Sequence, residues 1–253
     1  MICLRVIFTF ALAGTLLAQQ PAEEHKNRDL GYDDTPQIPG QKWRVHDNTR
    51  PHPPKVAPAG KPGQPPADAI VLFNGKDLSQ WVMRGRNGTT GEPQWKVKDG
   101  YLEVVPRKGG IMTKEKFGDI QLHVEWMEPK DVEGTSQSRG NSGIELMTRY
   151  ELQVLESNQG VTYADGQAAA IYGTWPPLVN ATRKPGEWQT YDIVMIENYL
   201  TVVHNDQVIM DNAEVEGITG GALDSKEWEP GPIYLQGDHS QIFYRNIVLT
   251  PAE

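Results

Sequence analysis

The sequence predicts an all-β domain in which two antiparallel sheets pack face to face as a jelly-roll sandwich. Runs with period-two alternation, rich in β-branched and aromatic residues, recur from residue 67 to the C-terminus. Gly, Pro, Asn and Asp separate these runs, and no apolar pattern of helical spacing extends over a dozen residues. Frequent short strands without helices are typical of two packed sheets.

The expected strands follow one another at short intervals. They lie within residues 95–105, 120–129, 142–148, 150–156, 188–211, 232–239 and 243–251. The pair Asp99-Gly100 predicts a tight hairpin turn, because both central residues of such a turn need positive φ. Asn198 and the pair Asn205-Asp206 mark further turns in the long run over 188–211.

Alternation assigns the faces of each strand. The inward side chains are expected at Ile120, Leu122, Val124 and Trp126 in one strand and at Tyr150, Leu152 and Val154 in another, with Ile233 and Leu235 in a third. The outward ones include Gln121, His123, Glu125, Glu151, Gln153, Tyr234 and Gln236. Outward polar residues are ordinary in a sheet with one buried face, but these residue types also suit hydrogen bonding to sugars.

The N-terminal quarter has a different character. Residues 1–18 carry Arg5, an apolar run over 6–17 and then Ala18, the pattern of a secretory signal, and the run is too short for a membrane span of about 20 residues. We therefore expect export to the periplasm or the extracellular space, with no membrane span after cleavage. Residues 19–66, rich in Pro and Gly, are expected to form an extended, mostly solvated linker before a domain over 67–253. Docking of Trp43 and Val45 on the domain stays open as the alternative.

Composition narrows the classes of partner and cofactor. Cys3, the single cysteine, lies in the expected signal, so disulfides and cysteine-based zinc sites are not expected. The formal net charge is -9 and basic residues are scattered, so nucleic acid is not an expected partner. No cofactor is expected, no tightly spaced metal motif is present, and a loop-bound calcium near Asp224 or Asp238 stays open. The oligomeric state is not set by the sequence.

Several motifs carry a family resemblance. They are "IVLFNGKDLSQW", "RGNSGIEL", "YELQVLES", "DGQAAAIYG", "GEWQTYDIV" and "QGDHSQIFYRNI". Together they resemble the 3-keto-disaccharide hydrolase domain family, over nearly all of the chain from residue 67 onward. The resemblance implies a concanavalin A-like jelly roll, the scaffold of laminarinase-type β-glucanases, and a carbohydrate substrate whose glucose unit is oxidised at C3.

The resemblance also implies a mechanism. A ketone at C3 acidifies the proton on C2, so a base can form an enolate and the substituent on C1 can leave by elimination, after which water adds. Such a reaction needs a base near C2, donors for the C3 oxygen and an acid for the departing oxygen. It needs neither a nucleophilic carboxylate nor the paired spacing of retaining glycosidases.

The pattern E-x-Q-x-x-E, formed by Glu151, Gln153 and Glu156, differs from the E-x-D-x-x-E of β-glucanases by one residue. Residues five apart in a regular strand face opposite sides unless a bulge intervenes. Gln153 holds no charge, but its amide can donate to a sugar oxygen. The glutamine weakens the double-displacement interpretation and leaves the keto-sugar interpretation untouched. An ordinary β-glucanase-type hydrolase and a non-catalytic, lectin-like glycan-binding module remain the alternatives.

The sequence offers three candidates for the catalytic acid or base, of which Glu151 is the leading one and the two histidines are its competitors. These are Glu151, His239 and His123; an unperturbed histidine titrates near pH 6.5, well placed for a base. Candidates for substrate binding share polar or aromatic side chains in loops or at strand ends: Arg139, Asn141, Gln153, Tyr172, Trp175, Gln236 and Asp238. Among them an arginine can stabilise an enolate, a tyrosine can donate a proton and a tryptophan can stack on a sugar.

Overall fold

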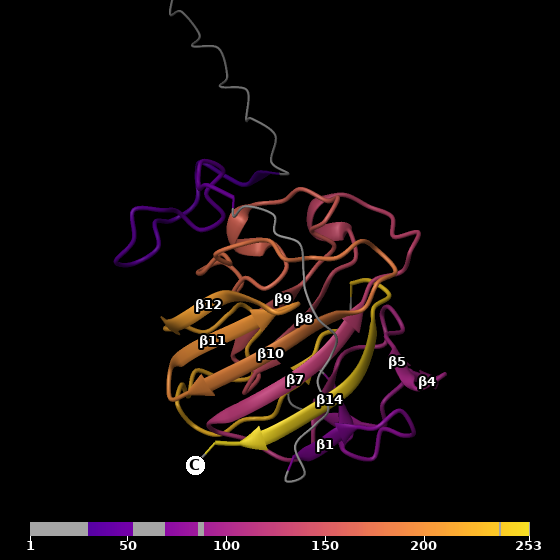
Figure 1. The fold of residues 1–253 in the computed structure, drawn as a ribbon. Coiled ribbons are helices and arrows are strands. Elements are labelled where there is room, and N and C mark those ends of the chain that lie inside the picture. Colours follow the sequence, from indigo (N-terminus) through magenta and orange to yellow (C-terminus); the bar gives the residue numbers. More distant parts are fainter. Residues whose placement is uncertain (1–29, 53–68, 86–88, 238, 253) are drawn as a thin grey trace, which may run out of the picture.

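The predicted class is confirmed: two antiparallel sheets form a sandwich (Figure 1). The computed structural model describes residues 30–52, 69–85, 89–237 and 239–252. An eight-stranded sheet has the order β12-β11-β10-β7-β14-β5-β4, with β1 paired to β14, and a six-stranded sheet has the order β3-β2-β6-β13-β8-β9.

The strands of the larger sheet are β1 (Ile70–Phe73), β4 (Lys96–Lys98), β5 (Tyr101–Glu103), β7 (Ile120–Met127), β10 (Gln189–Ile196), β11 (Tyr199–His204), β12 (Gln207–Glu214) and β14 (Phe243–Pro251). Those of the smaller sheet are β2 (Trp81–Arg84), β3 (Thr90–Gly91), β6 (Ile111–Thr113), β8 (Ser142–Leu146), β9 (Tyr150–Val154) and β13 (Tyr234–Leu235). Short 3-10 turns, η3 (Ser136–Ser138) and η4 (Ala164–Gly166), lie in the loops around β8 and β9.

The core lies between the sheets and follows the predicted alternation. Val124 and Trp126 of β7 are fully buried from one side, and Ile144, Leu152 and Leu235 are fully buried from the other. Burying each of these side chains contributes about 1.5–3 kcal/mol. This packing fixes which face of β8, β9 and β13 points away from the core.

Two predicted hairpin turns are confirmed. Asp99 (φ 50°) and Gly100 (φ 83°) join β4 to β5, and Lys98 pairs with Tyr101 across them. Asn205 (φ 50°) and Asp206 (φ 64°) join β11 to β12. Positive φ at both central positions matches the twist of the flanking strands, which explains the Asp, Asn and Gly found there.

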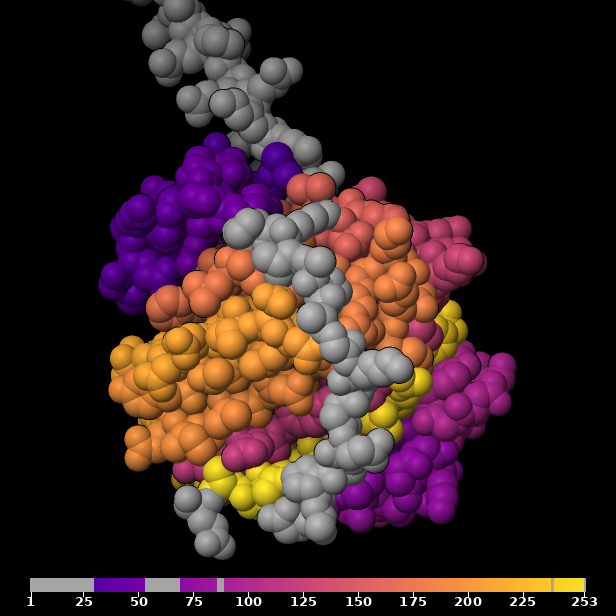
Figure 2. Space-filling view, in the orientation of Figure 1, coloured from indigo at the N-terminus to yellow at the C-terminus, as the bar shows by residue number. Residues whose placement is uncertain are grey.

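Residues 30–52 are packed against the domain, whereas the sequence predicted a mostly solvated linker (Figure 2). His46 and Arg50 bond to Asp165 and Thr174 of the domain. The correction has a physical cause: polar and aromatic side chains between the prolines supply specific contacts, which a count of apolar residues does not weigh. The expected signal over residues 1–18 lies outside the described residues, and within the described ranges no helix has the length and apolar character to cross a membrane.

Candidate functional site

The candidate site lies on the outer face of the six-stranded sheet, over its strands β8, β9 and β13. The register pairs Gly143 with Gln153 and Glu145 with Glu151. Ile144 and Leu152, which alternate with these residues, point into the core. Glu151 and Gln153 therefore point to the opposite face, as predicted.

A pocket of about 700 Å³ opens on this face, within the range of small-ligand sites. It is lined by Arg107, Gln137, Ser138, Asn141, Glu151, Gln153, Tyr172, Gly220, Gln236, His239 and Ser240. The structure thus brings together the sequence-predicted residues Asn141, Glu151, Gln153, Tyr172, Gln236 and His239. Asp238, also predicted, lies outside the described residues.

Glu151 is the carboxylate among the described lining residues, and the residue is 6% exposed. Burial raises the pKa of Glu151 to about 7, against the opposing effect of a hydrogen bond from Gln236. A Cβ atom at Gly143 of β8 would lie 2.6 Å from Glu151 Oε1. The absence of a side chain at Gly143 therefore leaves the space that the Glu151 carboxyl group occupies. A carboxyl group with this pKa can take or give a proton near neutral pH.

An amide network forms the wall beside Glu151. Gln137 Nε2 donates to Thr162 Oγ1 at 2.9 Å and to the Gly166 carbonyl at 2.8 Å. Gln137 Oε1 in turn accepts from Gln153 Nε2 at 3.0 Å. Asn141 Nδ2 donates to the Gln137 carbonyl at 2.7 Å. Within the described part of the chain, Asn141 Oδ1, Gln153 Oε1 and Gln236 Oε1 are buried without a hydrogen-bond partner. An unpaired buried acceptor costs about 1–3 kcal/mol, so this wall is suited to a ligand rich in hydroxyl donors.

Tyr172 and His239 complete the lining that the sequence predicted. The hydroxyl groups of Tyr172 and Tyr163 share a hydrogen bond of 2.5 Å. Burial raises the pKa of Tyr172 above its usual value, so its hydroxyl stays protonated at neutral pH. His239 is exposed at the pocket, next to Ser240, whose N–H donates to the Asn141 carbonyl at 3.1 Å.

The arginine at the pocket is Arg107, not Arg139. The sequence predicts that Arg139 binds the substrate, but Arg139 does not line the pocket. Its Nε donates to Glu156 at 2.5 Å and its Nη1 donates to the Val132 carbonyl at 2.8 Å. The exposed Arg107, at φ 66°, sits in the loop between β5 and β6 and was missed from the sequence. The only signal for it is the neighbouring pair Gly109-Gly110, which marks a loop after a strand.

His123 is not part of this pocket. It lies on β7 in the larger sheet, and the alternation that buries Val124 turns His123 to the other outer face of the sandwich. Burial lowers the pKa of His123, but a hydrogen bond to Asp192 (2.6 Å) and the negative charge of Glu125, 3.8 Å from Nε2, outweigh burial and raise the pKa to about 9. Glu125, expected on the exposed face, is fully buried because Arg245 (2.6 Å) and Asn246 of β14 cover it.

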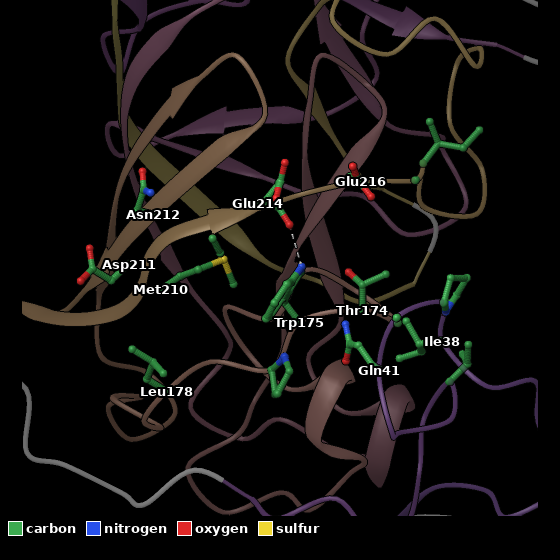
Figure 3. A pocket seen from close by; sticks show the side chains of 18 of the residues that line it. Ile38, Gln41, Thr174, Trp175, Leu178, Met210, Asp211, Asn212, Glu214 and Glu216 are labelled. Carbon is green, nitrogen blue, oxygen red and sulfur yellow. Dashed lines mark hydrogen bonds between the residues drawn. The ribbon is translucent and has the colours of Figure 1, made fainter.

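Trp175 lines a second pocket, of about 870 Å³, between residues 38–45 and β12 (Figure 3). Its Nε1 donates to the Glu214 carbonyl at 3.1 Å. Trp175 therefore does not face the same hollow as Glu151, although it follows Tyr172 by three residues.

Glu156 is separated from Glu151 by the regular geometry of β9. The register of β8 and β9 has no bulge, and β9 ends at Val154. Glu156 is 1% exposed and accepts from Arg139 and from three backbone N–H groups of residues 158–160. The E-x-Q-x-x-E pattern therefore yields one carboxylate at the pocket and one that braces a loop.

The described residues contain no group of three or more His, Cys, Asp or Glu side chains that could hold a metal ion. Asp224, one of the two positions considered for calcium, accepts from Arg149 Nε at 2.8 Å.

A family model and a similar solved structure together place this sandwich in the glycosyl hydrolase-like class. The model of the 3-keto-alpha-glucoside-1,2-lyase-like domain matches residues 68–250, and the chain belongs to this family. A comparison with curated proteins returns no match.

Three similar solved structures come from Parabacteroides distasonis, and all are provisionally described as glycosyl hydrolases. One is 39% identical, with a TM-score of 0.67 over 80% of this chain and 93% of the other. The second is 18% identical (TM-score 0.55, 74% and 94% covered), and the third is 24% identical (TM-score 0.53, 73% and 99% covered). These last two share the fold with this chain.

Proposed function

We propose that this protein cleaves 3-keto-glycosides by elimination and hydration, with Glu151 as the base. The observation that carries the proposal is the convergence of a buried carboxyl of pKa about 7 with three unpaired amide oxygens on one pocket wall. The amide oxygens accept hydrogen bonds from sugar hydroxyls and orient the sugar ring, so that the Glu151 carboxyl group can take a proton from it. Family membership supports the same substrate class.

Each step has a group at the pocket. Glu151 takes the C2 proton, and the electrons of the C2–H bond form an enolate whose C3 oxygen receives hydrogen bonds from Arg107. The enolate collapses to a C1–C2 double bond as the C1–O bond breaks, and Tyr172 gives its proton to the departing oxygen. Water then adds its hydroxyl to C1 and its proton restores Tyr172, while Glu151 returns a proton to C2.

Two alternatives fit the site less well. Double displacement uses two carboxyl groups about 5–5.5 Å apart, whereas Glu151 is the carboxylate among the described lining residues and Glu156 braces a loop. A glycan-binding module does not need a carboxyl group that takes and gives a proton, and the burial of Glu151 costs free energy.

The proposal includes export by the N-terminal signal, supported by Arg5 and the apolar run over 6–17.

The first test uses a 3-keto-disaccharide in deuterated water, followed by NMR. We expect cleavage with deuterium at C2 of the released sugar, because the proton on Glu151 exchanges with solvent before its return. A substrate deuterated at C2 is expected to react several-fold more slowly. Cleavage with neither C2 deuterium nor an isotope effect would refute elimination, and saturable binding without cleavage would make the protein a glycan-binding module.

The pH dependence follows from the raised pKa of Glu151. The base must be deprotonated, so kcat/KM is expected to rise about tenfold per pH unit below pH 7 and to level off above it. His239→Ala is expected to keep this rising limb at the same pH. If the limb disappears in His239→Ala and persists in Glu151→Gln, His239 is the base and the assignment to Glu151 is wrong.

A further inference from the structure

Residues 30–52 lie outside the matched family domain, yet they contact Tyr172, which lines the pocket. His46 makes this contact. Its backbone N–H donates to Asp165 Oδ2 and its ring Nδ1 lies 2.9 Å from Asp165 Oδ1, so both oxygens of one buried carboxylate hold the residue. Two hydrogen bonds accepted by one carboxylate hold both the backbone and the ring of His46.

The fixed ring of His46 packs against Tyr163 and Tyr172, and Tyr172 lines the pocket. The ring centroid of His46 lies 3.9 Å from that of Tyr163 and 5.0 Å, edge-on, from that of Tyr172. The hydroxyl groups of the same two tyrosines share a hydrogen bond of 2.5 Å. His46 thus contacts both members of the pair that presents the Tyr172 hydroxyl to the pocket.

A second contact holds the chain that follows Tyr172. Arg50, which is 8% exposed, donates from Nη1 to the Thr174 carbonyl at 3.2 Å and lies 4.0 Å from Asp165. A Cβ at Gly173 would lie 3.8 Å from His46 Cε1, so the segment also packs on the residue between them. The N-terminal segment therefore braces residues 172–174 at two points.

We propose that His46 is a positioning residue for the proposed reaction: held by Asp165, it sets the Tyr163–Tyr172 pair so that the Tyr172 hydroxyl meets the departing oxygen. This inference rests on the proposed function. In this proposal residues 30–52 contribute to catalysis and do not only connect the domain to the N-terminus.

The test is a double-mutant cycle in the full chain. His46→Ala and Tyr172→Phe are each expected to lower kcat for a 3-keto-disaccharide by 10-fold or more, with KM changed by less than about threefold. The double variant is expected to be no slower than Tyr172→Phe alone, because both changes remove the same group from its task. His52→Ala, a change of the same residue type at an exposed position of the same segment, is expected to keep the activity of the unaltered protein.

The inference would be overturned if the double variant lost kcat by the product of the two single losses, or if His46→Ala kept the kcat of the unaltered protein. A readout independent of turnover uses protein with ¹³C-labelled tyrosine rings, in which Tyr172→Phe assigns the Tyr172 signal. His46→Ala is expected to shift that signal, since a ring 5.0 Å away is lost. If the unaltered protein fails to cleave the keto-sugar, the proposed function fails, and an unmoved Tyr172 signal separately overturns the positioning role.

Discussion

Glu151→Gln is expected to lower kcat for a 3-keto-disaccharide by about 10³-fold and to leave KM nearly unchanged. Glutamine keeps the size of the side chain in the space that Gly143 leaves, but it cannot take a proton from C2. The fold is expected to persist. The folded-state pKa of Glu151, about 7, exceeds the ordinary 4.5, so the unaltered protein loses stability as pH rises from about 4.5 to 7, and the variant lacks this loss.

The matched control is Glu145→Gln. Glu145 pairs with Glu151 across β8 and β9, but its carboxylate lies 3.6 Å from Arg84 and it does not line the pocket. We expect its kcat to stay within a few-fold of the unaltered protein. A Glu151→Gln variant that keeps more than a tenth of the turnover would remove Glu151 from the role of base.

The fold was largely predictable because its determinants are local. Alternation marks the buried face of β7 and β9 whatever those strands pair with, and Asp99-Gly100 specifies its turn through backbone sterics alone. The packing of residues 30–52 was not predictable from composition, because it depends on a few contacts with distant residues such as Asp165.

The site was predictable where strand geometry sets it. Glu151 and Gln153 follow from the alternation of β9, and both line the pocket. His123 shows the limit: alternation gives an outward side chain but does not say on which of the two sheets the strand lies. Arg107 and Gln137 come from loops, whose approach to the pocket depends on tertiary packing and leaves no periodic signal.

Glu156→Ala is expected to destabilise the protein by about 3–5 kcal/mol without a specific loss of catalysis. The buried carboxylate of Glu156 neutralises Arg139 at 2.5 Å and accepts N–H groups of residues 158–160 at 2.7–2.9 Å. Alanine leaves the guanidinium without its counter-charge and three amides without their acceptor. At about 2–4 °C per kcal/mol for a domain of this size, thermal unfolding should shift down by about 10 °C.

The control for Glu156→Ala is Glu103→Ala, which removes a surface ion pair with Lys96 at 3.3 Å and a hydrogen bond from Gln241 at 2.9 Å, and is expected to cost about 1 kcal/mol. Below its melting temperature, Glu156→Ala should retain most of the kcat of the unaltered protein, since Glu156 is turned away from the pocket face of β9. A loss of 10³-fold in kcat with unchanged thermal stability would instead make Glu156 the partner of Glu151 in a carboxylate pair. That outcome would restore double displacement, because a glutamate that only braces a loop cannot slow the chemistry while leaving the fold intact.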